Sequence, residues 1–243
     1  MIGQGKFSAD VARGFELLAR LGVAGYRNFR PNSQRSTTDF LRNSESYVQL
    51  YQRYLSCQAF DILLDDGSVL FFRRDPSDKT LLSYGYLEFP YVGISYKAFV
   101  AEMGGEVGEV DLSEEYEDYR AQLPLRTHVT PIRYDWSPTL YREGAHPASH
   151  LHLGHESEMR LAVDALLTPV QFILFVLRHF YVDVWEGQAC KTPEVINVIN
   201  EVASIADEHV VPKYRKGRDF FELRLVSIVD AQARFRKIRP NFR

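Results

Sequence analysis

Apolar residues near the start of the chain recur at intervals of three and four, the spacing that places side chains on one face of a helix. The positions that share this face are Val11, Phe15, Leu18 and Leu21. Ser8 offers a capping side chain and Gly22 a stop signal, as expected at the two ends of a helix. The pattern therefore predicts a helix over residues 9–21.

Similar spacing predicts further helices. One apolar face is formed by Tyr47, Leu50, Tyr51, Tyr54 and Leu55. Farther along, Thr168, Pro169 and Gln171 provide an N-cap, a proline at the first helical position and the second member of a capping box. These residues predict a helix over residues 169–181.

Helical patterns also occur between and after these segments. Residues 96–102 and 113–122 are candidates for short helices, and Thr192 and Pro193 open a later one. The buried face of that later helix would consist of Val195, Val198, Ile199, Val202, Ile205 and Ala206.

Between the helical segments the period changes to that of strands. Residues 59–64 and 69–73 are apolar runs on either side of an Asp-Asp-Gly-Ser turn, which predicts a β-hairpin. Further strand-like runs are residues 81–89, 127–135, 149–153 and 159–163. Because no linker or repeat separates these elements, we expect a single α+β domain over residues 1–243, with a mainly antiparallel sheet packed with amphipathic helices.

The composition favours a globular protein over a membrane or secreted one. Hydrophobic residues make up 45% and charged residues 25% of the 243 residues, as in ordinary globular proteins. The N-terminus has no apolar signal segment, and the apolar stretch at residues 165–177 is too short to cross a bilayer. Cys57 and Cys190 form no C-x-x-C pattern. We therefore expect a cytoplasmic protein without membrane contact or cysteine chemistry.

The formal net charge of −3 is unevenly distributed. Residues 101–120 contain eight acidic residues, whereas residues 213–243 form a basic C-terminal end with ten basic and three acidic residues. The basic side chains that alternate with apolar ones near its terminus are Arg234, Arg236, Lys237 and Arg239. Such a mixture can bind phosphates and stack on bases, so these four are candidate nucleic-acid-binding residues. Docking against the acidic segment 102–118 is the alternative.

Histidines gather in one short segment. Four of the seven lie within residues 146–155, namely His146, His150, His152 and His155. On a strand, residues two positions apart face the same side. His150 and His152 should therefore converge in one hydrogen-bonding cluster within a concave site, and Asp135 could approach from a neighbouring strand.

Three roles remain open for this cluster. The candidate ligands of a metal site are His146, His150, His152 and either Asp135 or Glu156. A metal-free phosphodiester cleavage site would use one histidine as base and another as acid, with Arg133 or Arg160 stabilising the phosphate charge. In the third role the rings only pack and hydrogen-bond. We expect no stoichiometric metal, and a structural role for His128, His179 and His209.

Several of these segments resemble an uncharacterised prokaryotic family, domain of unknown function 2290. They are Arg-Tyr-Asp at 133–135, His-Pro-Ala-Ser-His-Leu-His-Leu-Gly at 146–154, the helix from Leu-Thr-Pro at 167–169 to Phe-Tyr at 180–181, and the Asp-Asp-Gly-Ser turn at 65–68. The resemblance covers roughly residues 45–185. It implies no established activity.

The Arg-Tyr-Asp strand followed by a proline- and histidine-rich loop is also similar to a family of small toxins of toxin–antitoxin pairs. Their antitoxins neutralise them by direct contact, and those toxins are much shorter than this chain. Carried over residue by residue, the similarity points to Arg133, Asp135, His146, His150 and His152.

Two functional hypotheses follow, and neither assigns a cofactor. In the first, the chain is a nuclease-like hydrolase acting on nucleic acid, for example a prokaryotic toxin or phage-defence effector. Arg133 would hold phosphate, Asp135 would orient a histidine, and His150 and His152 would share proton transfer. In the second, the chain is a non-catalytic interaction or regulatory subunit that uses the hairpin and the basic tail to bind a partner protein encoded nearby.

Overall fold

The computed structural model describes most of the chain up to residue 198 and a short backbone segment beyond it. The described residues are 2–29, 44, 46–75, 78, 80–106, 109–142, 145–155, 157, 159–163, 166–189, 191–193, 195–198 and the backbone of 222–223. None of the helices within these residues is long and apolar enough to cross a membrane.

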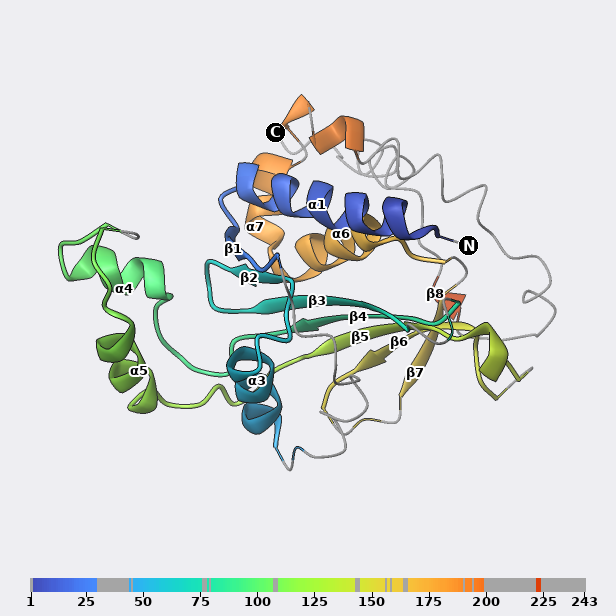
Figure 1. Ribbon diagram of the computed structural model, residues 1–243, viewed down its shortest axis with the longest axis horizontal. Helices are drawn as coiled ribbons and strands as arrows, with labels where there is room; N and C mark the ends of the chain where they lie inside the picture. Colours follow the sequence, from blue (N-terminus) through green and yellow to red (C-terminus); the bar gives the residue numbers. More distant parts are fainter. Residues whose placement is uncertain are drawn as a thin grey trace, which may run out of the picture.

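A sheet whose strands follow one another in chain order forms the centre of the fold (Figure 1). The antiparallel strands are β1 Ala24–Arg27, β2 Ile62–Leu64, β3 Val69–Arg74, β4 Leu82–Leu87, β5 Ile132–Trp136, β6 Ser149–Leu153 and β7 Arg160–Val163. A two-residue strand, β8 Glu222–Leu223, pairs with β7 in parallel. Each of the first seven strands therefore pairs with its neighbours in the sequence.

Helices cover both faces of this sheet (Figure 1). On one face lie α1 Gln4–Arg20 and α6 Pro169–Phe180, and on the other lies α3 Tyr47–Ser56. The short helix α7 Val182–Val184 and a π-helical turn, Trp185–Ala189, follow α6. The residues between β4 and β5 form a lobe beside the sheet that contains α4 Tyr96–Glu102 and α5 Ser113–Ala121. A 3-10 turn, Pro138–Leu140, follows β5.

The alternation of side chains along the strands creates two hydrophobic cores. Leu70 and Phe72 of β3 belong to the core beneath α1 and α6, whereas Val69 and Phe71 belong to the core beneath α3. Phe71 stacks on Tyr54 of α3, with ring centroids 4.7 Å apart. Both faces of β3 are therefore buried, as expected for a strand near the middle of a covered sheet.

Local sequence accounts for the hairpin and for the start of α6. Gly67 has a φ of +88° in the turn between β2 and β3, a conformation that glycine adopts without strain. The Asp66 carboxylate accepts a hydrogen bond from the backbone N–H of Ser68. At α6, Thr168 and Gln171 form both hydrogen bonds of a capping box.

The structure confirms the predicted α+β fold but moves several boundaries, two of them by five residues. Helix α1 begins at Gln4 rather than at residue 9, because Phe7 extends the buried face of the helix toward its N-terminus, and Ser8 consequently lies inside it. Strand β5 begins at Ile132 rather than at residue 127. Pro131 has no N–H for a ladder, and the backbone N–H of Arg126 instead donates to Pro90 O in the loop that enters the lobe.

One strand was missed from the sequence, and one predicted helix is described only at its start. Strand β1 was not predicted, because its four residues include Gly25 and show no alternation of apolar and polar side chains. The helix expected after Thr192 is helical over residues 195–198, and Val195 is buried in the core. Its continuation through residues 199–206 lies outside the described residues, as does the basic end 213–243 apart from the backbone of β8.

Two glycines of α1 provide a matched test of the packing between α1 and α6. A methyl group on Gly14 would lie 2.1 Å from Ile173 Cδ1, whereas one on Gly5 would have no heavy atom within 4 Å. Both substitutions gain similar helix propensity, up to about 1 kcal/mol. We expect Gly14→Ala to be less stable than Gly5→Ala by about 1–3 kcal/mol in urea denaturation, because the core around Ile173 is overfilled. Equal stability of the two variants would contradict this contact.

Candidate functional site

The candidate site is built on the paired strands β5 and β6. Ile132, Tyr134 and Leu151 point into the core beneath α1 and α6. Successive residues of a strand face opposite sides, so the intervening residues face the other side of the sheet. Asp135 lies directly opposite His150, and Arg133 lies directly opposite His152. The strand register therefore brings four polar side chains together on one face.

Asp135 is the anionic centre of this group. Its Oδ1 accepts a hydrogen bond from Ser83 Oγ of β4 at 2.8 Å, and its Oδ2 accepts one from Arg133 Nε at 3.0 Å. His152 Nε2 lies 3.2 Å from the same Oδ2 atom. Burial alone would raise the pKa of Asp135, but the His152 hydrogen bond, the Arg133 charge and the Ser83 hydroxyl together lower this pKa to about 2. Asp135 is therefore ionised at neutral pH.

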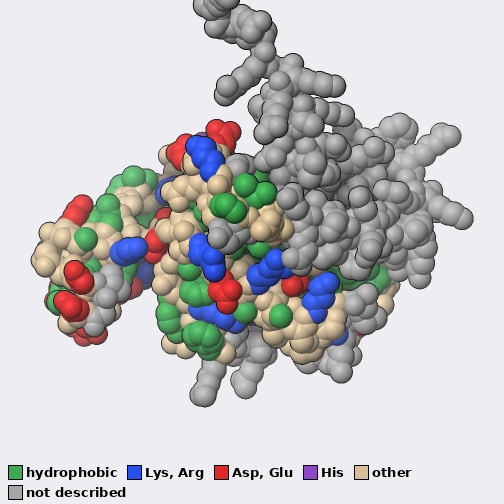
Figure 2. Space-filling model, turned by 90° about the horizontal axis from the view of Figure 1, so that it is seen from above, with side chains coloured by type: hydrophobic (Ala, Val, Ile, Leu, Met, Phe, Trp, Pro, Cys, Tyr) green, Lys and Arg blue, Asp and Glu red, His purple; other side chains and the backbone are tan. Residues whose placement is uncertain are grey.

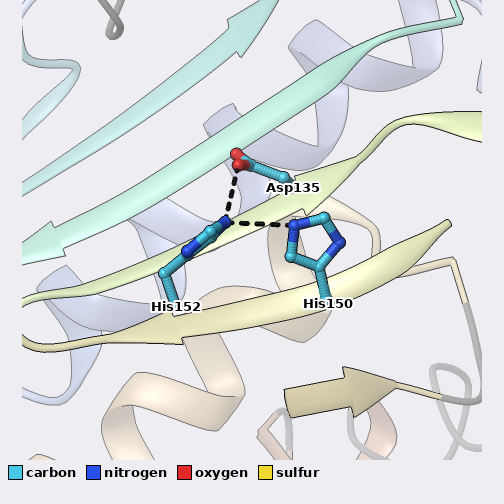
Figure 3. A group of neighbouring side chains, drawn as sticks. All are labelled: Asp135, His150 and His152. Carbon is cyan, nitrogen blue, oxygen red and sulfur yellow. Dashed lines mark hydrogen bonds and ion pairs between the residues drawn. The ribbon is translucent and has the colours of Figure 1, made fainter. Parts of the chain in front are cut away.

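The two histidines meet through their Nε2 atoms, which lie 3.0 Å apart (Figure 3). His150 Nδ1 lies 2.9 Å from Pro147 O. A carbonyl oxygen can only accept, so we assign the proton of neutral His150 to Nδ1 and a lone pair to its Nε2. His152 Nε2 then carries the proton that lies between His150 and Asp135.

Burial determines the charge state of His150, whose residue is 1% exposed. Burial, followed by the charge of the neighbouring His152, lowers the pKa of His150 to about 4. His150 is therefore neutral at neutral pH. The side chain of His152 is 12% exposed and that of Asp135 is 22% exposed, so the cluster reaches solvent on the side of the carboxylate.

The other two histidines of the segment take different positions. The ring of His146 packs edge-on against that of His150, with centroids 5.0 Å apart. Within the described part of the chain, no polar atom is hydrogen-bonded to the buried Nδ1 of His146. His155 packs instead against Tyr47 of α3, with ring centroids 6.0 Å apart. The structure thus joins His150 and His152 with Asp135, places His146 beside them, and separates His155.

The other predicted residues that the structure describes lie outside this hydrogen-bonded group. Arg160 lies directly opposite His152 on β7, which places it on the same face of the sheet. His128 is exposed in a loop, and His179 Nδ1 pairs with Phe175 O on α6. The residues that fall outside the described part are Glu156, His209, Arg234, Arg236, Lys237 and Arg239.

Two members of the site were not found from the sequence. Ser83 binds Asp135 although 52 positions separate the two residues, and no local pattern marks it. Pro147 contributes only its carbonyl oxygen, which every residue type possesses.

A pocket between α3 and α5 is lined by residues such as Gln52, Arg53 and Arg120, and its lining includes none of the cluster residues. The 3.0 Å contact between their Nε2 atoms confirms the expected convergence of His150 and His152. The concave site expected around them stays a prediction, since the α3–α5 pocket is separate from the cluster.

The cluster has the composition of a metal site as well as that of a proton-transfer site. One ligand atom from each of Asp135, His150 and His152 lies within 4.8 Å of the other two. Two imidazoles and one carboxylate are a common protein ligand set for zinc and other first-row transition metals. The same atoms can equally hold the proton that His152 Nε2 now carries between them.

Comparison with known proteins gives a family but no activity. A family model described as "Uncharacterized conserved protein (DUF2290)" matches residues 28–219. This segment contains β5, β6 and every residue of the cluster. Neither the curated proteins nor the solved structures yielded a match.

The neutral state of His150 predicts how stability depends on pH. Its pKa of about 4 is below the ordinary value of 6.5, so between these pH values the unfolded chain binds a proton that the folded chain excludes. The contribution to the unfolding free energy is therefore complete above pH 6.5 and is lost as the pH falls toward 4. The loss should be at most about 3 kcal/mol, at 1.36 kcal/mol per pKa unit.

The measurement is urea denaturation of chelator-treated protein at several pH values between 4 and 7. In a His150→Gln variant this part of the pH dependence should disappear, because glutamine does not titrate. His128→Gln, at an exposed position, should keep the wild-type slope. Parallel pH profiles for wild type and His150→Gln would show that His150 is not held neutral by the fold.

Proposed function

The chain belongs to the DUF2290 family of uncharacterized conserved proteins, and we propose that it is a hydrolase acting on the phosphodiester bonds of nucleic acid. The reaction centre of the proposed hydrolase is the cluster of Asp135, His150 and His152. The observation that carries the proposal is the convergence of an ionised carboxylate and two imidazole Nε2 atoms on one point. Such a convergence is suited to activating a water molecule.

Each member of the cluster has a distinct chemical role in this proposal. The lone pair on His150 Nε2 is available at neutral pH, because the low pKa keeps this ring unprotonated. His152 lies between His150 and Asp135 and passes its Nε2 proton to or from the reacting groups. Asp135 orients His152 and stabilises its positive charge, as a carboxylate does for a catalytic imidazole. His146 is adjacent to the centre through its contact with His150.

Positive charge beside the cluster supports a phosphate substrate. Arg133 donates a hydrogen bond from Nε to Asp135. The guanidinium group has two further nitrogens that can bind phosphate oxygens. Arg160 lies on the same face of the sheet, opposite His152. The basic residues of the C-terminal end, Arg234, Arg236, Lys237 and Arg239, would add a binding segment for single strands. In a cell, such a hydrolase would act as a toxin or as a phage-defence effector.

The lobe between β4 and β5 supports a second candidate function, that of an interaction or regulatory subunit. Eight acidic residues lie between positions 101 and 120, and Figure 2 shows acidic side chains on the surface of the lobe. Apolar side chains exposed on it or beside it are Val92, Met103, Val110 and Leu125. Exposed apolar residues that form a patch with a polar rim often mark a protein-binding surface.

Cleavage assays with labelled oligonucleotides test the proposed hydrolase. The full-length protein should cleave at least one of single-stranded RNA, double-stranded RNA, single-stranded DNA and double-stranded DNA. His152→Ala and Asp135→Asn should each lower the cleavage rate by about 10²–10⁴-fold, the usual effect of removing a proton-transfer group. Failure of the wild-type protein to cleave any of the four substrates would favour the interaction subunit.

Tyr134→Phe is the matched control for these variants. The Tyr134 hydroxyl lies on the opposite face of β5 and interacts with Ser149 Oγ and the backbone N–H of Leu167. Its removal should cost about 1–3 kcal/mol of stability, because buried polar groups lose their partner, while cleavage should continue. Loss of cleavage in Tyr134→Phe to the same extent as in His152→Ala would attribute the effect to general destabilisation.

Salt dependence tests the proposed nucleic-acid-binding segment. If the C-terminal basic residues contact about four phosphates of a single strand, log affinity should fall with log salt at a slope near −3, from roughly 0.7 per phosphate. Deletion of residues 234–243 should flatten that slope and weaken binding to all sequences alike. Fluorescence anisotropy measures both quantities. Unchanged binding after the deletion would exclude these residues from the interface.

A further inference from the structure

We infer that Asp135, His150 and His152 form the binding site of one divalent transition-metal ion, with zinc as the best match. The inference rests on the proposed function for its role: the ion would activate the hydrolytic water in place of proton transfer by His150 and His152. Binding of the ion itself is measurable without any substrate. The ligand atoms would be Asp135 Oδ2, His150 Nε2 and His152 Nε2.

The distances between these atoms fit a metal ion. Zinc binds imidazole nitrogen and carboxylate oxygen at about 2.0–2.2 Å, and tetrahedral geometry then separates neighbouring ligand atoms by about 3.3 Å. The two Nε2 atoms are 3.0 Å apart, and His152 Nε2 is 3.2 Å from Asp135 Oδ2. Two edges of the coordination polyhedron are therefore nearly formed by the protein alone. The remaining edge is no longer than 4.8 Å.

The surrounding hydrogen bonds orient two of the ligands. His150 Nδ1 donates to Pro147 O, which leaves Nε2 as the metal-binding atom, the usual arrangement of a histidine ligand. Ser83 Oγ holds the other carboxylate oxygen of Asp135. Ser83 lies on β4, and Pro147 lies two residues before the first residue of β6. A designed or natural site needs such support to bind an ion with a fixed geometry.

Metal binding changes which atom of His152 carries a proton, and the hydrogen bonds show why the other two ligands are unaffected. His152 Nε2 carries the proton between His150 and Asp135, and metal binding requires a lone pair on that atom. If His152 is neutral, the proton on Nε2 is transferred to Nδ1 through solvent. If His152 is charged, one proton is released. His150 and Asp135 already present lone pairs and lose no proton.

Arg133 is the group that opposes binding, because its positive charge lies beside Asp135. A carboxylate oxygen has more than one lone pair, so Oδ2 can accept from Arg133 and bind a metal at the same time. The combination of metal ion and Arg133 leaves the site positively charged, which suits an anionic phosphodiester. Three protein ligands leave further positions for water, as in catalytic zinc sites.

Titration of full-length, chelator-treated protein with zinc chloride in a calorimeter tests the site. We expect one zinc ion per chain and a raised melting temperature in the presence of zinc, because the ion binds only the folded site. Magnesium should not substitute, since it prefers oxygen ligands. His152→Ala and Asp135→Asn should weaken zinc binding at least 100-fold. Asp135→Asn keeps the side-chain shape, so it covers the case in which His152→Ala fails to fold.

His128→Ala is the control, because His128 is an exposed histidine in a loop outside the cluster. It should bind zinc as the wild type does. A wild-type protein that binds no zinc, or that binds it equally well after His152→Ala and Asp135→Asn, would overturn the inference. Stoichiometric zinc binding without cleavage of nucleic acid would support the metal site and reject the proposed hydrolase. Cleavage that persists in the zinc-free protein would support the proposed hydrolase and reject activation of the hydrolytic water by the ion.

Discussion

The register between β5 and β6 is the constraint on which the candidate site depends. A shift of one residue would turn every side chain of a strand to the opposite face. In β5 it would move Asp135 into the core and turn Tyr134 out of it, and in β6 it would do the same to His150 and Leu151. Tyr134 prevents such a shift, because its hydroxyl is buried and bonded to both Ser149 Oγ and the Leu167 backbone N–H. The apolar core beneath α1 and α6 thus aligns the polar cluster on the other face.

The face of the sheet opposite α1 and α6 is apolar on β3 and β4 and polar on β5 and β6. Helix α3 packs on Val69 and Phe71 of β3 and on Leu87 of β4. The corresponding positions of β5 and β6 carry Arg133, Asp135, His150 and His152, which bond to one another and to Ser83. Buried polar groups are tolerated when such bonds satisfy them. The face therefore changes from a hydrophobic core to a charged cluster within a few strands.

The chemistry available at this site depends on how close the side-chain atoms of Asp135, His150 and His152 lie to one another. Burial keeps His150 neutral, and hydrogen bonds keep Asp135 ionised. Two lone-pair donors and the proton of His152 thus meet at one point, which is where either proton transfer or metal binding can occur. Arg133 and Arg160 give this part of the sheet a positive border, which is the electrostatic basis for proposing a phosphodiester substrate.

The sequence alone determined those features that depend on neighbours along the chain. The hairpin around Gly67, the capping box at Thr168 and the shared face of His150 and His152 all follow from local periodicity and turn chemistry. Tertiary structure decided the rest. The bond between Ser83 and Asp135, the neutral state of His150 and the separation of His155 from the cluster depend on strand pairing and burial. These properties join residues far apart in the chain, and no local pattern of side chains encodes them.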